Sequence, residues 1–311
     1  MDVSVIIVNY NTRSVTRHCI ESIFAYTTGI EFEVILVDNG SHDGSFEEFT
    51  QLDFGPSLIL VKRLQNLGFG YANRIGVEYA SGKYLFFLNS DTYLKNNAIK
   101  NIYDYMEKEQ GIGVAGGYLE KPDGNYSRSF GSFPSTRSLV KYCLASTAIS
   151  LSIITKHFDT ISFRRTRVVC SKISESEVDY VSGADMMVRT SDYWTAGGFD
   201  PCYFMFFEEV QLQKNLSSHG FRNVVINGPR IVHLEGASVN KSPRYIKMYS
   251  FREYLFDRSA ILYARKNFGV SLALFLGVVF YFKYMNPCFL LHNIGRIRPT
   301  SLVALSLRDS K

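Results

Sequence analysis

Short apolar segments alternate with helix-like stretches through the first 115 residues, and this alternation restricts the fold more than any other feature. Five segments have the length and composition of strands buried on both faces: residues 3–9, 33–38, 57–61, 84–88 and 112–115. Three stretches between them place apolar residues at helical spacing: residues 12–26, 70–80 and 96–109. The pattern predicts an α/β fold with a mostly parallel central sheet, helices on both faces, and a ligand site at the carboxyl ends of the strands.

The pattern changes after Gly116. The turn signal Pro122-Asp123-Gly124 predicts a hairpin over residues 118–128. The remaining expected elements are an amphipathic helix (134–157), a strand (178–188), a helix (208–219), two short strands (223–226 and 230–233), and helices from Arg244 onward with a break at Gly269.

Positive charge is concentrated in two segments of the chain. The net charge of the whole chain is +5, but residues 137–172 carry +6 and residues 241–311 carry +9, so the remainder is acidic. Such segments suit an anionic surface, either nucleic acid or a membrane. We expect no nucleic-acid binding, because the chain has no recognisable reading motif and its basic residues adjoin long aliphatic stretches.

The apolar stretch 270–282 is 13 residues long and is followed by Lys283. A membrane-spanning helix needs about 20 apolar residues, so we expect an interfacial helix with Lys and Arg at the headgroup boundary. A core helix or an oligomer interface is the alternative. We therefore predict a catalytic domain over residues 1–240, with a basic amphipathic insertion at about 134–172, and a C-terminal helical membrane-associating segment over 241–311.

Cysteine usage and the amino terminus bear on the compartment. The five cysteines are odd in number and widely spaced without a C-x-x-C pair, which argues against a zinc ribbon or a disulfide scaffold and for a reducing compartment. Met1 leads directly into an apolar segment without a basic region, so we expect no secretory signal.

Polar residues follow the first two strands where a ligand site is expected. The first strand ends in Asn9-Tyr10-Asn11-Thr12, and the second ends in Asp38, with Ser41 three residues later. A carboxylate at a strand end can accept the imide N–H of uracil or thymine. Asp38 is otherwise a turn carboxylate, and Ser41 is otherwise a helix cap.

Carboxylates elsewhere offer metal-binding and acid–base chemistry. Asp91 follows the fourth strand and can bind Mg²⁺ or Mn²⁺, or it caps the next helix. The adjacent Glu208 and Glu209 lie among aromatic residues that can raise the pKa of a carboxylate toward that of a useful base, or they form an acidic first helical turn. His233 ends a short strand and can complete a metal site, or it is an ordinary polar residue.

Six segments, in this order, resemble the family 2 glycosyltransferases with a GT-A fold: VSVIIVNYNT, VDNGSHDGS, NLGFGYAN, YLFFLNSDT, GGFD…FMFFEEVQL and IVHLEGAS. They are most similar to the bacterial rhamnosyltransferase-like branch, over about residues 3–240. The resemblance implies an inverting transferase that moves a sugar, L-rhamnose from dTDP-rhamnose as the first choice, to an acceptor hydroxyl. A UDP-hexose or UDP-N-acetylhexosamine donor is the alternative, and a catalytically silent nucleotide-binding scaffold is a third.

The resemblance also implies residue roles. Asp38 would hold the pyrimidine base, and Asp91 and His233 would hold Mg²⁺ or Mn²⁺. Glu209 would be the catalytic base, with Glu208 beside it. The donor nucleotide would further contact Tyr10, Asn11, Thr12, Ser41, Asn66, Gly68, Asn73 and Ser90.

Three positions depart from the family pattern. Asn89 stands where the metal motif often has its first Asp, Glu209 replaces the usual Asp and is longer by one methylene, and Gln211 stands where another Asp is usual.

Partners and location follow from the same resemblance. It implies a polyprenyl-diphosphate-linked glycan as acceptor, which the basic segments would reach at the cytoplasmic face of the bacterial inner membrane. A dinucleotide-dependent dehydrogenase is excluded, because residues 9–13 after the first strand contain no glycine where the G-x-G-x-x-G fingerprint would be required.

Overall fold

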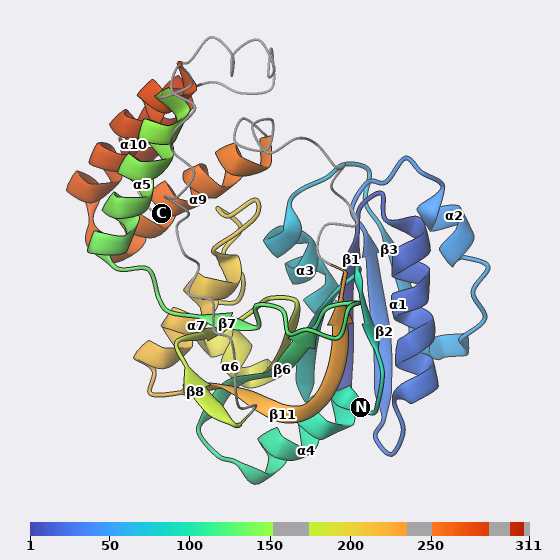
Figure 1. Cartoon of the computed structure of the whole chain (residues 1–311). Helices are drawn as coiled ribbons and strands as arrows, with labels where there is room; N and C mark the ends of the chain where they lie inside the picture. The colour runs from blue at the N-terminus through green and yellow to red at the C-terminus, as the bar shows by residue number, and fades with distance from the viewer. Residues whose placement is uncertain (152–173, 235–250, 286–298, 308–311) are drawn as a thin grey trace. The chain divides into compact units, whose positions relative to one another are not determined.

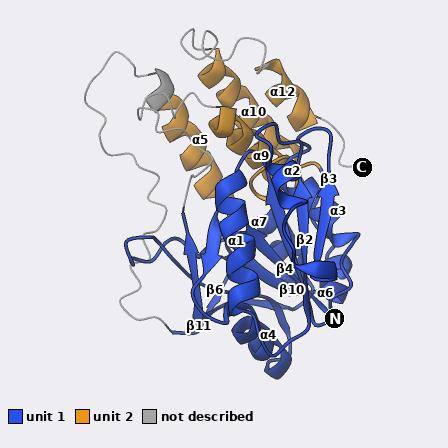
Figure 2. Cartoon of the chain, turned by 90° about the vertical axis from the view of Figure 1, so that its right-hand side faces the viewer, with its two compact units in different colours: residues 1–133, 168–201, 208–240 blue, residues 134–167, 202–207, 241–311 orange. Residues whose placement is uncertain are grey.

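The chain forms two compact units. In the computed structural model, which describes residues 1–151, 174–234, 251–285 and 299–307 (Figure 1), each unit combines separate stretches of sequence. Unit 1 consists of residues 1–133, 168–201 and 208–240, and unit 2 of residues 134–167, 202–207 and 241–311 (Figure 2).

Four parallel strands form one half of the sheet in unit 1, in the order β3-β2-β1-β4. They are β1 (Val3–Asn9), β2 (Phe32–Asp38), β3 (Leu58–Lys62) and β4 (Tyr84–Asn89). Asn9 is in register with Asp38, and Val8 with Asn89. The polar residues that end these strands therefore meet at one edge of the sheet.

The other half of the sheet is mixed. β10 (Asp185–Arg189) runs antiparallel between β4 and β6 (Ile112–Glu120), and β11 (Arg222–His233) runs parallel to β6. β5 (Thr92–Leu94) and β8 (Ser176–Val178) pair with β11, while β7 (Phe130–Gly131) pairs with β9 (Tyr180–Val181) in a small separate sheet. The expected α/β class with a mostly parallel sheet is confirmed.

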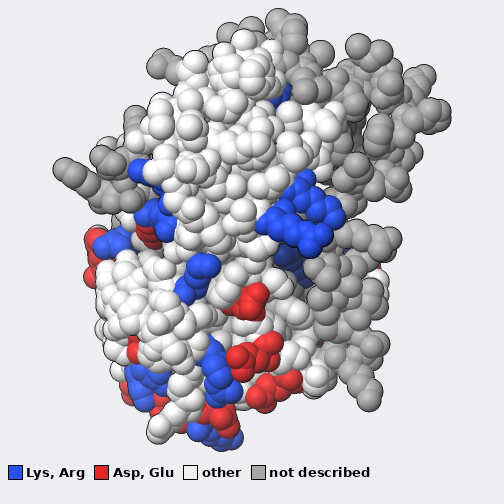
Figure 3. Space-filling model, turned by 90° about the vertical axis from the view of Figure 1, so that its left-hand side faces the viewer, with Lys and Arg blue, Asp and Glu red and all other residues white. Residues whose placement is uncertain are grey.

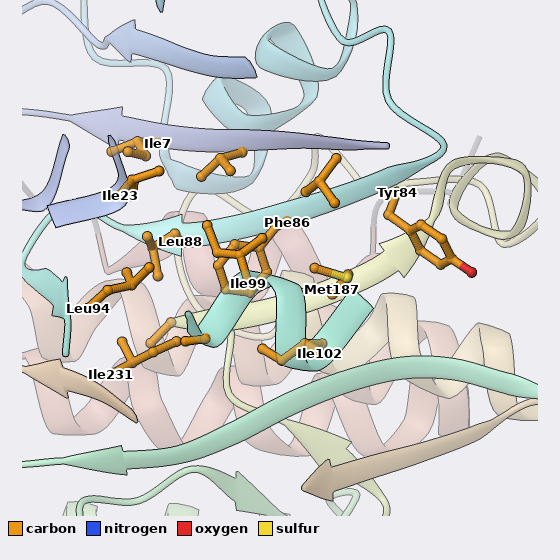
Figure 4. Close-up of a cluster of buried hydrophobic side chains, with 14 of the residues drawn as sticks. Ile7, Ile23, Tyr84, Phe86, Leu88, Leu94, Ile99, Ile102, Met187 and Ile231 are labelled. Atoms are coloured by element: carbon orange, nitrogen blue, oxygen red, sulfur yellow. The ribbon is translucent and has the colours of Figure 1, made fainter. Parts of the chain in front are cut away.

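Side-chain alternation along the strands builds one core on each face of the sheet. Val5 and Ile7 pack toward α1 (Arg13–Tyr26) and α4 (Ala98–Lys108), a cluster that Figure 4 shows around Phe86 and Ile99. The next residues along, such as Ile6, face the opposite cluster, which includes residues of α3 (Phe69–Val77), α6 (Thr190–Thr195) and α7 (Glu208–Ser218). Each fully buried large apolar side chain contributes about 1.5–3 kcal/mol to stability.

A short helix, α2 (Ser45–Phe49), and a 3₁₀ turn, η1 (Gly55–Ser57), connect β2 to β3.

Several expected elements have different limits in the structure. The strand expected over 178–188 is broken into β9 and β10, because residues 182–184 leave the sheet around Gly183. The two strands expected at 223–226 and 230–233 are one strand, β11, with an irregularity between Ile226 and Arg230. Pro229 lies in this irregularity, and proline has no N–H to give to a sheet ladder.

The hairpin expected over 118–128 is confirmed by the antiparallel bridge between Glu120 and Tyr126. The helix expected over 134–157 is confirmed over α5 (Thr136–Leu151), and its remainder lies outside the described residues.

Unit 2 is helical in its described part. Besides α5 it contains α9 (Phe251–Phe268), α10 (Val270–Tyr284) and α12 (Thr300–Leu307). The expected break at Gly269 is confirmed: this glycine has a φ of +90° and separates α9 from α10. No helix among the described residues combines the length and apolarity needed to cross a membrane.

An ion pair lies in the interior of unit 2. The Lys283 Nζ is 2.6 Å from the Asp257 Oδ2, and neither side chain is exposed by more than 2%. The hydroxyls of Tyr284 and Tyr142 donate to the two oxygens of Asp257 at 2.5 and 2.7 Å. Burial lowers the pKa of Lys283, but the charges of Asp257 and Glu253 raise the pKa by more, so this lysine stays charged.

Lys283, which follows the apolar stretch, is therefore not one of the basic residues that could lie at a headgroup boundary. Its side chain turns inward because Asp257, 26 residues earlier on α9, provides a buried counter-charge.

We predict that Lys283→Ala will lower the free energy of unfolding by about 3–5 kcal/mol, because Asp257 would be left as an unpaired buried charge. Urea unfolding followed by circular dichroism measures this change. Lys141→Ala, which removes an exposed lysine from α5, is the control and should shift stability by no more than about 0.5 kcal/mol. Equal losses in the two variants would contradict a stabilising role for the buried pair.

Candidate functional site

Asn9 organises the carboxyl ends of the first two strands. Its side chain is fully buried, and the Nδ2 donates to the Asp38 Oδ1 at 2.7 Å and to the Ser41 Oγ at 2.9 Å. Its Oδ1 accepts from the hydroxyls of Thr12 and Thr16 at 2.9 and 2.8 Å. All four hydrogen-bonding positions of the amide are therefore used, which joins the end of β1 to the end of β2 and to the start of α1.

The loops after β1 and β2 are interlocked. The Ser41 Oγ accepts from the backbone N–H of Asn11 at 3.0 Å, and the Asn11 Oδ1 accepts from the backbone N–H of His42 at 2.8 Å. The second Asp38 oxygen accepts from the Ser41 N–H at 3.3 Å. Gly40 has a φ of +81°, and a Cβ there would lie 2.7 Å from the backbone of Gln65, so no larger residue fits. Tyr10 is 41% exposed at this edge.

A second loop, residues 66–68, is attached beside Asp38. The Asn39 Nδ2 donates to the Asn66 Oδ1 at 3.0 Å, and the same oxygen accepts from the Gly68 N–H at 2.9 Å. The Asn39 Oδ1 accepts from the Leu67 N–H at 3.1 Å. Asn66 and Gly68 are thus brought to the edge where Asp38 lies. The buried Asn73 donates to the Phe69 carbonyl within α3.

Asp91 and His233 lie together although 142 residues separate them. The Asp91 Oδ1 is 3.2 Å from the His233 Nε2, and the Asn89 Nδ2 is 3.5 Å from the same nitrogen. The pairing of Thr92 on β5 with His233 on β11 produces this proximity. The Ser90 and Thr12 hydroxyls, 3.3 Å apart, connect this segment to the loop after β1. Asp91 is not a helix cap, since α4 begins at Ala98 after Asn97.

The donor set of Asp91 and His233 fits a divalent cation. A carboxylate oxygen and an imidazole nitrogen this close can bind one ion, and Mg²⁺ in particular is usually held by one or two carboxylates together with substrate phosphates. Among the described residues no group of three or more His, Cys, Asp or Glu side chains could hold a metal. The remaining positions around an ion at Asp91 and His233 would then belong to a phosphate-bearing ligand and water.

Glu208 and Glu209 begin α7 in different surroundings. Glu208 is 4% exposed, and burial, followed by the charge of Glu209, raises the pKa of Glu208 well above its usual range. Glu209 is half-buried and packs over Gly183. A Cβ added to Gly183 would lie 3.4 Å from the Cβ of Glu209. Burial therefore favours the neutral form of Glu208, and Glu209 is the less buried member of the pair.

Residues 181–184 connect Glu209 to the segment that contains Asp91. The Ala184 carbonyl, next to Gly183, accepts from the backbone N–H of Asn89 at 3.0 Å. The buried Gln213 amide bonds both backbone groups of Val181, at 2.7 and 2.8 Å, and fixes α7 to β9. Glu209 and Asp91 are therefore positioned by the same short segment.

Asp185 is a buried carboxyl that the sequence reasoning missed. Its Oδ2 accepts from the Gly117 N–H at 2.8 Å, and its Oδ1 has no hydrogen-bond partner among the residues that the structure describes. Burial raises the pKa of Asp185 well above its usual range. Gln213 was also missed, and Asn9 was named at the end of the first strand but given no role. The available signal in each case was a polar residue within an apolar run or on a buried helix face.

The sheet with its two-faced helical cover, and the carboxylates at the strand ends, have the arrangement expected of a GT-A fold. The family model described as "Glycosyl transferase family 2" matches residues 4–168, more than half of the chain, and the chain belongs to this family. The resemblance found in the sequence is confirmed.

Two relatives are rhamnosyltransferases. The N-acetylglucosaminyl-diphospho-decaprenol L-rhamnosyltransferase of Mycobacterium tuberculosis is 26% identical over 222 residues, which are 68% of this chain and 69% of the relative. Rhamnosyltransferase WbbL of Escherichia coli is 27% identical over 164 residues, half of this chain and 56% of the relative. The chain is thus rhamnosyltransferase-like within its family.

Solved structures show the same fold at low identity. GalNAc-T7 with UDP, GalNAc and Mn²⁺ aligns with a TM-score of 0.59 and 14% identity over 98% of this chain, which is about half (53%) of that chain. Staphylococcus aureus TarS 1–349 in complex with UDP-GlcNAc aligns with a TM-score of 0.53 and 14% identity, covering 99% of this chain and 80% of that one.

We predict that Asp185→Asn will flatten the dependence of stability on pH. The folded protein keeps Asp185 protonated above the ordinary Asp pKa of about 3.9, whereas the unfolded chain releases this proton. Wild-type stability should therefore fall as the pH rises through this window, by up to about 1.4 kcal/mol per pH unit from this group. The midpoint of chemical unfolding between pH 5 and 8 measures the slope.

Asp123→Asn is the matched control for this experiment. Hydrogen bonds from Asn125 hold the pKa of the Asp123 carboxyl below its usual range, so this group is ionised throughout the window and its variant should retain the wild-type slope. A slope unchanged in Asp185→Asn would show that Asp185 is ionised in the folded protein.

Proposed function

We propose that the protein is an inverting glycosyltransferase that moves a sugar from a nucleoside diphosphate to an acceptor hydroxyl. The observation that carries the proposal is the connection of Glu209, through Gly183 and Ala184, to the segment in which Asp91 lies 3.2 Å from His233. A carboxylate that takes a proton and a pair of metal ligands for the leaving group are the two parts that a single-displacement transfer requires.

The donor nucleotide is assigned to the edge formed by the loops after β1 and β2. Asp38 would accept the imide N–H of a pyrimidine base. The two oxygens of Asp38 already accept hydrogen bonds from Asn9 and Ser41, and one carboxylate group can accept about four hydrogen bonds in total. The other nucleotide contacts are assigned to Tyr10, Asn11, Thr12, Ser41, Asn66, Gly68, Asn73 and Ser90.

The diphosphate would lie against Asp91 and His233. Mg²⁺ or Mn²⁺ bound there would supply Lewis-acid stabilisation of the negative charge on the leaving diphosphate. The chain contributes the carboxylate and imidazole that hold the ion, and Asn89 beside His233 restricts the position of the imidazole ring.

Glu209 is the proposed base. Burial favours the neutral form of Glu208, so the less buried Glu209 is assigned to take the proton of the acceptor hydroxyl, while the oxygen of that hydroxyl attacks the anomeric carbon opposite the diphosphate. One displacement with one base inverts the configuration, and no covalent sugar–enzyme intermediate is required.

The donor is proposed to be dTDP-rhamnose and the acceptor a glycan linked to a polyprenyl diphosphate. The names of the mycobacterial and E. coli relatives support L-rhamnose, and the first of these names also supports a lipid-linked acceptor. A UDP-hexose or UDP-N-acetylhexosamine is the alternative donor, favoured by the solved structures that contain UDP or UDP-GlcNAc. A lipid-linked acceptor would bring the protein to the membrane surface, at the cytoplasmic face of the inner membrane.

We predict that calorimetry will detect dTDP-rhamnose binding that requires Mn²⁺ or Mg²⁺, and that Asp91→Ala will weaken this binding at least tenfold, about 1.4 kcal/mol. Asp123→Asn, in a turn outside the site, should bind as wild type. Preference for a UDP-sugar in a parallel panel would change the donor but keep the mechanism. Failure to bind any nucleotide sugar would contradict the proposed function, and binding without turnover would favour a catalytically silent scaffold.

We predict that Glu209→Gln will lower kcat by about 10²–10⁴-fold without changing the Kd of the donor, because the variant loses the proton acceptor but keeps the shape of the side chain. Glu208→Gln should lose far less activity, since burial raises the pKa of Glu208 well above its usual range and so favours its neutral form. Single-turnover transfer, with donor hydrolysis as a second readout, measures both. A larger loss in Glu208→Gln would reverse the assignment of the base.

A further inference from the structure

The only charged residue of α10 lies on its buried side. The helix has 15 residues, of which Lys283 alone is charged, and this side chain pairs with Asp257 inside unit 2. The opposite side of α10 has four large exposed apolar residues at helical spacing: Phe275 (41%), Val278 (39%), Phe282 (58%) and Met285 (44%), the last directly after the helix. We call these four residues the α10 outer face.

This arrangement is the reverse of an ordinary surface helix. A surface helix in water buries its apolar stripe and turns charged residues outward, as α9 does with the exposed Arg252 and Lys266. The α10 helix instead buries a lysine and exposes aromatic and aliphatic side chains. Figure 3 shows a broad surface over the helices of unit 2 that is almost without charged side chains. Exposed apolar patches of this kind mark contact surfaces for protein or membrane.

Charge favours an anionic bilayer as the occupant of the α10 outer face. Residues 241–311 contain twelve Lys or Arg and three Asp or Glu, and the internal pairing of Lys283 with Asp257 leaves the excess of +9 unchanged. Basic residues near a membrane are attracted to its anionic lipids by about 1 kcal/mol each. A second copy of this chain is the less favoured occupant, because both copies would carry the same excess of positive charge to the contact.

The length of α10 fixes how it can meet a bilayer. Fifteen residues rise about 22 Å, whereas the hydrocarbon core is about 30 Å thick, so the helix can lie in the interface but cannot cross it. Phenylalanine and aliphatic side chains on one face, with basic residues nearby in the sequence, are typical of interfacial helices.

We propose that the α10 outer face inserts into the surface of an anionic lipid bilayer and holds the protein there. The proposal deepens the proposed function, since it rests on the assignment of a lipid-linked acceptor and names the surface that brings the enzyme to it. Insertion of the face is driven by burial of apolar area, and the basic residues of 241–311 provide the dependence on anionic lipid.

The test is co-sedimentation of the full-length protein with vesicles of phosphatidylcholine containing phosphatidylglycerol, at low salt. Phe275→Asp and Phe282→Asp, singly and together, should each lower the partition coefficient at least tenfold. Tyr79→Asp, which replaces an exposed aromatic residue of unit 1, is the matched control and should sediment as wild type. Sedimentation of the double variant equal to wild type would overturn the proposal.

A second measurement reports on insertion itself and does not depend on a destabilising charge. Trp194 is the only tryptophan of the chain, so Phe282→Trp in a Trp194→Phe background places a single fluorophore on the α10 outer face. Vesicles should shift its emission to shorter wavelength, and bromine-labelled acyl chains should quench it. An emission that vesicles leave unchanged, or a blue shift that appears without lipid and disappears on dilution as a dimer dissociates, would overturn the proposal.

Failure of this proposal can be told apart from failure of the proposed function. Vesicle binding is measured without nucleotide sugar, and donor binding is measured without vesicles. Normal donor binding with no lipid binding would overturn only the membrane face, whereas lipid binding with no donor binding would support the face and contradict the transferase assignment.

Discussion

The four hydrogen bonds of Asn9 are the interaction on which the arrangement of the site depends. This one buried amide holds Asp38, Ser41, Thr12 and Thr16, and so joins two strand ends and the first turn of a helix. A buried amide is costly unless all of its donors and acceptors are satisfied, and here each partner lies at the edge assigned to the nucleotide or on α1. The interactions that satisfy Asn9 in the core also orient Asp38.

The two proposed chemical parts of the site, the base and the metal ligands, are also connected by a few shared contacts. Gly183 lies under Glu209, the neighbouring Ala184 carbonyl binds Asn89, and the Gln213 amide holds the backbone of Val181. The proposed base and the proposed metal ligands therefore both depend on residues 181–184, which are the end of β9 and the three residues before β10. A Cβ at Gly183 would lie 3.4 Å from the Cβ of Glu209, so the Glu209 side chain packs directly on this backbone. The departure from Asp to Glu at 209 places one further methylene in this contact.

Buried charge has different uses in the two units. In unit 1, neither Asp185 nor Glu208 has a cationic partner among the residues that the structure describes, and burial raises the pKa of both groups well above the usual range. In unit 2, Lys283 is buried with carboxylates and remains charged. The first arrangement favours the neutral form of Glu208 beside the proposed base Glu209. The second removes the only charge of α10 from its surface.

Much of the fold could be predicted from the sequence, because buried parallel strands and amphipathic helices have characteristic periods. The limits of β1 were predicted to the residue, as was the break at Gly269, and the family followed from motifs in a fixed order. Contacts between distant residues could not be predicted in this way. The meeting of Asp91 with His233 joins residues 142 positions apart, and the burial of Lys283 joins residues 26 apart. The single strand β11 depends on its pairing with β6, which joins Arg230 to Tyr118 across 112 residues. Local periodicity reports which side of an element is apolar, but only the packed tertiary structure decides which partner a polar side chain finds there.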